Sequence, residues 1–222
     1  MCGERLFSGY ALGNPGETLC GVCRRLAPPF VRAAAYGNYE GGLRDLIHLL
    51  KYQQVRPAAN VLGRMLGEVI SGLEPVLPEH VLVVPVPLHA DKLRQRGFNQ
   101  SELIARSALK LREDKQRFEL QSQVLERKRE TASQIGLSSH QRRVNMRGAF
   151  AVARPELVAE RDILLVDDVL TTGTTASECA RTLRKAGASK VWVATVARTM
   201  KLEVMRVAVP EEQEALAATA GS

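Results

Sequence analysis

The sequence lacks long apolar runs, and no stretch approaches the roughly 20 residues that are needed to cross a bilayer. A signal-peptide pattern is also missing. Cysteines are few, four in 222 residues, and chains of this size and character rarely use so few as a disulfide framework. With 45% hydrophobic and 25% charged residues, the chain can bury one main core. We therefore expect a soluble, cytoplasmic protein with no membrane span.

Aromatic residues are scarce as well: five phenylalanines, four tyrosines and one tryptophan. Proteins that bind single-stranded nucleic acid stack its bases on aromatic side chains, so such platforms are limited here. Acidic residues are outnumbered 31 to 24 by basic ones, which gives a net charge of +7 and an isoelectric point near 9.5. A basic surface suits phosphorylated ligands or nucleic acid, although many solvated surfaces are basic. Composition leaves both ligand classes open.

Two common phosphate-binding motifs are absent from the most informative segment, residues 163–175 (ILLVDDVLTTGTT). It has one glycine where a dinucleotide fingerprint has three, and no Gly-Lys-Ser/Thr follows the turn as in a P-loop. What it has is an apolar run typical of a strand buried on both faces of a parallel sheet. Asp167 and Asp168 follow where that strand is expected to end. This is the sheet edge where open α/β proteins bind ligands.

Two adjacent carboxylates repel each other unless hydroxyls or a cation offset them, and a ribose diol and hydrated Mg²⁺ both fit. The next residues form a hydroxyl-rich loop before a helix expected over residues 176–186: Thr171, Thr172, Gly173, Thr174 and Thr175. The free N–H groups of a helix N-terminus favour a phosphate monoester. A simpler alternative, a strand followed by a capped helix, explains one acid and one threonine only. The segment therefore predicts a ribose-phosphate site.

Elsewhere, strand and helix patterns alternate. Strands are expected over residues 81–84, 162–166 and 190–197, and amphipathic helices from Gly41-Gly42 to about Tyr52, after Pro57, and over residues 99–111. This order predicts an α/β fold with a mostly parallel sheet. The segment 113–148 breaks the rhythm, because it is basic and has few large apolar residues. We expect it to be a flexible insertion that projects rather than packs.

Three segments carry a resemblance to a known family. Residues 163–175 look like the phosphoribosyl pyrophosphate (PRPP) motif of type I phosphoribosyltransferases, and residues 84–88 (VPVPL) and 96–100 (RGFNQ) resemble the ComF/GntX branch of that superfamily. Residues 125–150 match the same branch through a spaced pattern of Arg, Thr, Gln, Leu, Asn and Phe. The resemblance covers about residues 1–199. It implies a Rossmann-like type I phosphoribosyltransferase fold, with the domain at residues 31–199.

The resemblance also implies roles for individual residues. Asp167 and Asp168 would hold the ribose and Mg²⁺, and the threonine loop would hold the 5′-phosphate. A pyrophosphate loop would lie near Pro87, Leu88 and His89, with Arg94 and Arg96 beside it; arginine suits phosphate through its planar fork of donors. A mobile loop that closes over the site would include Arg127, Gln134 and Arg142. For each of these basic residues, a solvated surface position is the alternative.

Residues 1–30 hold Cys2, Cys20 and Cys23 and little periodicity, which suggests a small clip rather than a packed domain. The resemblance implies a four-cysteine zinc finger here, but only three cysteines are present, and structural zinc almost always takes four protein ligands. His48 is one candidate for the fourth ligand and is otherwise a surface or half-buried residue. Cys179 is expected to pack in the core. Zinc remains an open expectation.

Three functions fit the sequence. The first is an enzyme of the glycosyltransferase class that transfers phosphoribosyl from PRPP to an unidentified acceptor. The second is a competence-associated protein that takes part in DNA uptake or handles single-stranded DNA, with PRPP as effector or without catalysis. The third is a PRPP-sensing regulator, although no helix-turn-helix pattern precedes residue 81. Residues 200–222 are expected to be a tail, helical near 211–218, and a chain ended at Thr199 should still bind PRPP.

Overall fold

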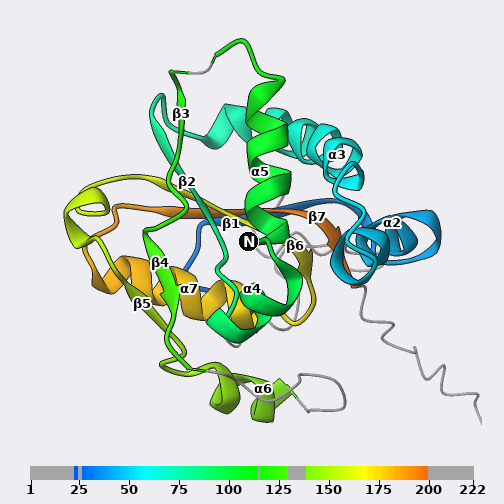
Figure 1. Ribbon diagram of the computed structural model, residues 1–222. Helices are drawn as coiled ribbons and strands as arrows, with labels where there is room; N and C mark the ends of the chain where they lie inside the picture. Colours follow the sequence, from blue (N-terminus) through cyan, green and yellow to red (C-terminus); the bar gives the residue numbers. More distant parts are fainter. Residues whose placement is uncertain (1–22, 25–26, 115, 130–138, 200–222) are drawn as a thin grey trace, which may run out of the picture.

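The protein is built on a five-stranded parallel sheet (Figure 1). The computed structural model describes residues 23–24, 27–114, 116–129 and 139–199. Every pairing in this sheet is parallel, as the alternation of strand and helix patterns predicted. Across the sheet the strands run in the order β1 (Arg32–Asn38), β7 (Val191–Arg198), β6 (Ile163–Leu170), β2 (Val81–Pro85) and β3 (Phe118–Leu120).

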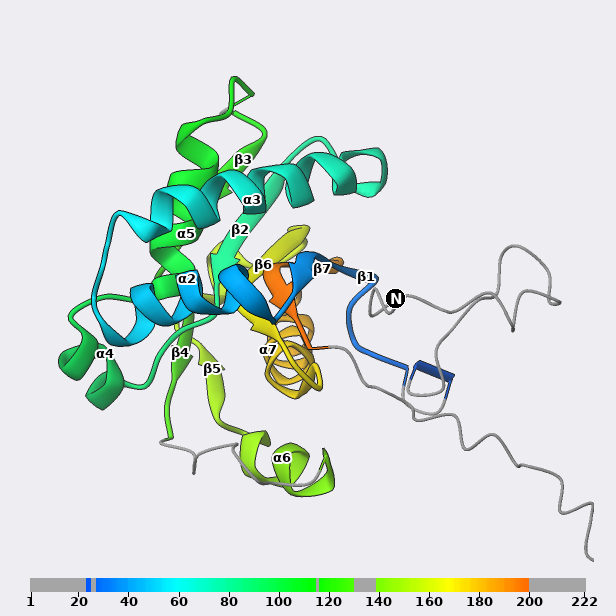
Figure 2. The same cartoon turned by 90° about the vertical axis from the view of Figure 1, so that its right-hand side faces the viewer.

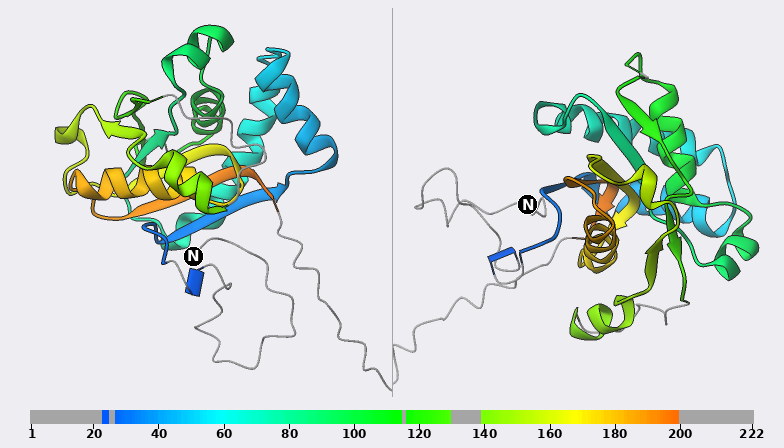
Figure 3. Two further views of the ribbon diagram at one scale, coloured as in Figure 1. Left: turned by 90° about the horizontal axis from the view of Figure 1, so that it is seen from below. Right: turned by 90° about the vertical axis from the view of Figure 1, so that its left-hand side faces the viewer.

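Helices cover both faces of the sheet, as Figure 2 shows from the side. One face carries α2 (Gly41–Tyr52), α3 (Ala58–Leu73) and α5 (Gln100–Lys110). The other carries α7 (Thr174–Lys185), which lies along the sheet in Figure 3. Shorter elements complete the described chain: η2 (Glu74–Val76), α4 (Ala90–Arg96), η3 (Pro155–Leu157) and those of residues 113–152. Among the described helices, none combines the length and apolarity that a bilayer crossing needs.

The three central strands alternate their side chains between two separate cores. Val83, Leu164 and Trp192 belong to the core under α2, α3 and α5. Val84, Leu165 and Val193 belong to the core under α7. Because successive residues of a strand point to opposite faces, an unbroken apolar run is what a doubly covered strand requires. The short apolar runs of the sequence are therefore explained by helices on both sides.

Trp192, the single tryptophan of the chain, lies near the start of β7. Only 3% of its surface is exposed, and it packs in the core shared with α3 and α5. In the sheet it stands between Arg32 of β1 and Leu164 of β6. The indole is thus fixed by neighbours on both sides and from above.

Helices α3 and α5 approach each other closely at Gly63. A Cβ atom built on Gly63 would lie 2.5 Å from both Cβ and Oγ of Ser107 and 3.0 Å from the backbone nitrogen of Ala108. Gly67, one turn further along α3, would meet nothing within 4 Å. The absence of a side chain at Gly63 is what lets the two helices pack at this distance.

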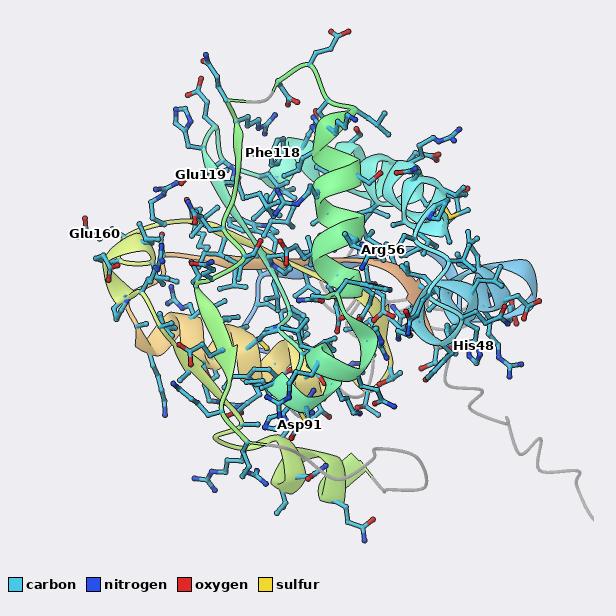
Figure 4. All side chains as sticks on the ribbon, viewed as in Figure 1. His48, Arg56, Asp91, Phe118, Glu119 and Glu160 are labelled. Atoms are coloured by element: carbon cyan, nitrogen blue, oxygen red, sulfur yellow. The ribbon has the colours of Figure 1, made fainter. Side chains whose placement is uncertain are left out.

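The expectation that residues 113–148 project from the domain is wrong for most of the described part. β3 joins the main sheet beside β2, and Figure 4 labels Phe118 and Glu119 on it. β4 (Leu125–Arg127) pairs with β5 (Phe150–Val152) in an antiparallel ribbon that leads to α6 (Ser139–Met146). Four apolar residues of the segment are buried, Phe118, Val124, Leu125 and Met146, whereas Val144 is 61% exposed. Residues 115 and 130–138 lie outside the described part.

Candidate functional site

The acid pair lies inside strand β6, where that strand continues past its neighbour. β2 pairs with β6 only as far as Val166, whose carbonyl accepts from the Val86 amide at 2.8 Å. β6 continues to Leu170, paired with β7 alone. The sequence placed Asp167 and Asp168 after the strand end, and this boundary is corrected by four residues. Pro85, the last residue of β2, and Pro87 have no N–H to donate, and β2 ends before β6, which leaves one side of β6 unpaired at the acid pair.

The N-terminus of α5 enters the space that β2 leaves. The Asn99 side chain caps this helix by accepting from the Ser101 amide at 3.0 Å, and it donates to the Val86 carbonyl at 3.0 Å. The Ser101 hydroxyl donates to Asp167 Oδ1 at 2.9 Å. The RGFNQ segment and the serine after it therefore anchor α5 to the end of β2 and bring a hydroxyl to the acid pair.

Lys51, in the last turn of α2, forms an ion pair with Asp168 through Nζ and Oδ2. Both side chains are largely buried, with 17% of Lys51 and 5% of Asp168 exposed. The neighbouring carboxylate is held differently, since Asp167 Oδ1 accepts from the Asp168 amide at 2.9 Å as well as from Ser101. One acid thus has an ammonium partner and the other has neutral donors.

The two acids differ in pKa for this reason. Burial, together with the charge of Asp168, raises the pKa of Asp167 to about 7. Burial alone would also raise the pKa of Asp168, but the Lys51 ammonium outweighs burial and holds that pKa below its usual value. Burial opposes the charge of Lys51, yet Asp168 keeps the Lys51 pKa above its usual value. The Lys51–Asp168 pair is therefore ionised, and Asp167 is the member that takes up a proton near neutral pH.

The threonine loop follows directly and leads into α7. Gly173 adopts the left-handed conformation (φ 73°) at the N-cap position, and as a glycine it has no side chain to cap the helix N-terminus. The hydroxyls of Thr172 and Thr174 are 2.8 Å apart. Glycine adopts this conformation without the strain that a Cβ brings, and it lets an anion approach the backbone. The loop therefore combines free helix dipole, hydroxyls and close backbone access beside the acid pair.

The two arginines near the predicted pyrophosphate loop differ in exposure and in their partners. Arg94 is 73% exposed and pairs with Asp91, which Figure 4 shows on α4. Arg96 is half-buried, donates to Gln100 Oε1 at 2.5 Å, and lowers the pKa of Asp168 through its charge. Pro87 is buried, while Leu88 and His89 are half-buried, and His89 caps α4. Of the two arginines, Arg96 is the one whose charge acts on the acid pair.

A cluster of rings lies beside the same acids. The Tyr39 hydroxyl and His48 Nε2 are 2.9 Å apart, and the His48 and Tyr52 rings meet edge to face at 5.1 Å. The Arg96 guanidinium lies 5.9 Å from the Tyr52 ring, whose residue is 68% exposed. Burial raises the pKa of Tyr39; the charge of Lys51 lowers this pKa and the charge of Asp168 raises it, which shows that both charges lie near the Tyr39 hydroxyl. His48 lies on α2 (Figure 4) and is half-buried, and its role as a zinc ligand stays a prediction.

The remaining predicted residues lie elsewhere or beyond the described part. Arg127, at the end of β4, is half-buried, with its guanidinium 5.7 Å from the Phe150 ring and Nη2 3.9 Å from Met146 Sδ. It reaches the predicted pyrophosphate loop through a parallel β-bridge to His89. Arg142 belongs to α6, where only its backbone is described, and Gln134 lies outside the described residues.

The cysteines divide in the same way. Cys23 is 4% exposed, whereas Cys2 and Cys20 lie outside the described residues, so the zinc expectation stays a prediction. Within the described ranges, no three His, Cys, Asp or Glu side chains are grouped as metal ligands. Cys179 is fully buried in α7, and burial raises its pKa well above the usual range. Its expected packing role is confirmed.

Two open surface hollows are both lined by Arg112 and Asp114 among others: one of about 350 Å³ lies between α5 and β3, and one of about 810 Å³ lies along α3 and the end of α5. Neither includes the acid pair or the threonine loop. We place the candidate site at the acid pair, because the buried charges and the helix N-terminus with its glycine N-cap are there.

Sequence reasoning missed two contributors to the site. Ser101 directly follows the RGFNQ segment, which resembles the ComF/GntX branch, and this position next to the motif could have indicated a role in the site. The sequence around Lys51 gives no such indication, since a lysine at the end of an amphipathic helix is ordinarily solvated and interacts favourably with the helix dipole. Only the placement of α2 over the strand ends brings Lys51 to Asp168.

Comparison with known proteins identifies relatives of this chain. A family model described as the phosphoribosyl transferase domain matches residues 103–213. The DNA utilization protein YhgH of Escherichia coli is 35% identical over 187 residues, which cover 82% of this chain and 78% of that protein. Competence protein F of Haemophilus influenzae is 31% identical over 209 residues, which cover 89% of this chain and 88% of that one.

Among solved structures, the chain is similar to an allosteric regulatory enzyme of purine biosynthesis and to a glutamine PRPP amidotransferase from B. subtilis. Identity is 22% in both cases, and the TM-scores are 0.38 and 0.39. The matches cover 64% of this chain but only 26% of those longer chains. The family model and the curated relatives above show that the chain belongs to the ComF family of the phosphoribosyltransferase superfamily.

Proposed function

We propose that the protein binds PRPP together with Mg²⁺ at the acid pair and the threonine loop, and that it transfers the phosphoribosyl group to an acceptor. The observation that carries this proposal is the junction of β6 and α7. There, β6 runs past the end of β2 with two adjacent carboxylates, and a helix N-terminus whose N-cap is a glycine follows within a few residues. A sugar with neighbouring hydroxyls and a phosphate ester matches both halves of that junction.

The residues divide the work of holding PRPP. Asp167 and Asp168 accept hydrogen bonds from the ribose hydroxyls, and the loop from Thr171 to Thr175 donates to the 5′-phosphate. Arg96, whose charge acts on Asp168, would donate hydrogen bonds to the leaving pyrophosphate. Carboxylate oxygens are the ligands that Mg²⁺ prefers, so the acid pair fits this ion. When bound, Mg²⁺ neutralises charge on the pyrophosphate.

In the transfer reaction, the acceptor displaces pyrophosphate from C1 of the ribose. The bond to pyrophosphate breaks as the bond to the acceptor forms, and positive charge develops on the ribose ring. In this proposal the carboxylates of Asp167 and Asp168 stabilise this positive charge, and Arg96 stabilises the negative charge of the leaving group. Catalysis in this proposal consists of positioning and electrostatics.

A calorimetric titration with PRPP, with and without Mg²⁺, tests the proposal. We expect wild-type protein to bind PRPP in a Mg²⁺-dependent manner. The double variant Asp167→Asn/Asp168→Asn should bind it at least roughly 100-fold more weakly, because each lost charge-assisted hydrogen bond is worth about 1.5–3 kcal/mol. Asp162→Asn, the same change at the other end of the strand, serves as control and should bind normally. The absence of PRPP binding in the wild type would refute the proposal.

A second function is favoured by a specific observation. The names of the relatives refer to DNA utilization and competence, and the exposed Tyr52 ring with Arg96 beside it has the elements of a base-stacking site. On this alternative the protein handles single-stranded DNA in association with a competence machinery, with PRPP as effector or without catalysis.

Fluorescence anisotropy with a labelled single-stranded oligonucleotide tests this second function. If it holds, binding should weaken steeply with salt, because bound phosphates release counterions. Tyr52→Ala should cost about 1–3 kcal/mol of binding free energy, the usual value of one stacked base. Tyr36→Ala removes another exposed tyrosine and should have no effect. Equal losses in both variants, or no binding at all, would exclude a role for Tyr52 in DNA handling.

A further inference from the structure

Lys51 holds a position that the ribose-phosphate chemistry does not itself require. It extends from the last turn of α2 to Asp168 Oδ2, a carboxylate oxygen that the proposed function needs for its ligand. Because 17% of the lysine side chain remains exposed, solvent reaches part of it. Its four-carbon stem can swing the ammonium away without moving the helix.

The balance of charges at the acid pair decides which cation can replace the Lys51 ammonium at Asp168. The acid pair carries at most two negative charges, and Lys51 already supplies one positive charge in direct contact. Arg96 adds a second positive charge nearby, and it has no ion-pair partner among the described acidic side chains. A free divalent cation that arrived while Lys51 stayed in place would make the site strongly positive. It would also have to give up tightly held water to reach a carboxylate that is 5% exposed.

The charge balance is different for a divalent cation that arrives bound to a polyphosphate ester. Such a complex brings the cation that Asp168 needs and the phosphate oxygens that a displaced ammonium needs. Lys51 can then exchange a carboxylate for a phosphate, so that neither buried charge is left alone.

From this balance we infer that Lys51 is a resident counter-cation of the acid pair, which excludes free divalent metal and releases Asp168 only to a metal–polyphosphate complex. The inference rests on the proposed function for the identity of that complex. Lys51 is on this view a positioning residue that sets the order of binding. A lysine that only fastens α2 to β6 would stabilise the fold without affecting metal binding.

Binding of Mn²⁺ alone separates these two roles. Electron paramagnetic resonance counts free Mn²⁺ at mildly alkaline pH, in wild type, Lys51→Met and Lys51→Arg. Lys51→Met should bind Mn²⁺ roughly tenfold more tightly than wild type or better, because a contacting charge shifts carboxylate affinity for protons by about one to three pKa units and acts on metal similarly. Lys51→Arg keeps the charge and should resemble wild type. Lys110→Met, at the end of α5, removes an exposed lysine as control.

Thermal unfolding guards against a folding defect. Lys51→Met should melt below wild type, and Mn²⁺ should restore much of the lost melting temperature, because the metal replaces the missing charge. Equal Mn²⁺ affinity in wild type and Lys51→Met, or no recovery of melting temperature, overturns the inference. If PRPP binds the wild type while these metal results fail, the proposed function stands and only the role of Lys51 falls. If PRPP does not bind while the metal results hold, the proposed function falls and the exclusion of free metal by Lys51 remains.

Discussion

Gly63→Ala is expected to destabilise the protein by about 2 kcal/mol or more, although alanine is normally the better helix former. An added Cβ would lie 2.5 Å from Ser107, and the Ala108 backbone at 3.0 Å leaves little room to retreat. Gly67→Ala, in the same helix with open space around it, is the matched control and should gain roughly 0.5–1 kcal/mol. Urea unfolding measures both variants.

Opposite signs for two identical substitutions one turn apart would be hard to obtain from helix propensity alone. A double-mutant cycle adds a check: Ser107→Gly should cost roughly 0.5 kcal/mol in the wild type but less, or nothing, beside Gly63→Ala. Gly63→Ala with stability equal to or above wild type would show that α3 and α5 can separate without loss.

Gly173→Ala is expected to weaken PRPP binding by about 10- to 100-fold, the value of one or two lost hydrogen bonds to a charged group. The left-handed backbone at φ 73° disfavours any Cβ, so the loop should shift away from the geometry that aims its N–H groups. Calorimetry with PRPP and Mg²⁺ gives the affinity.

Gly187→Ala supplies the control for this loop. Gly187 is also left-handed, at φ 98°, but precedes β7 at the opposite edge of the sheet from the acid pair. Both variants should lose about 1 kcal/mol of unfolding free energy, and only Gly173→Ala should lose PRPP affinity. Normal affinity in Gly173→Ala would place the phosphate elsewhere.

The parts of the fold that sequence predicted are those with strong local patterns. The run before Asp167, the glycine at 173 and the amphipathic period of α3 each report their structure within a few residues. Hence the sheet, the main helices and the threonine loop were expected close to their observed places. The end of β6 was misplaced, because its length depends on pairing with β7 and not on its own residues.

The parts that sequence missed depend on distant neighbours. β3 and β4 are three residues long, too short for a periodic signal, and are strands because β2 and β5 pair with them. β1, rich in alanine, is held by β7. Lys51 reaches Asp168 across more than a hundred residues of chain. No local pattern encodes such contacts, because they arise only when the layers assemble.

Trp192 gives the protein a single optical reporter whose position is known. Because the indole is 3% exposed between β1 and β6 under α3 and α5, its emission should shift strongly when the sheet loses its helical cover. The same burial places it near the start of β7, while the acid pair lies toward the far end of the neighbouring strand. Intrinsic fluorescence is therefore a monitor of folding in this protein, and ligand binding calls for a probe placed at the other edge of the sheet.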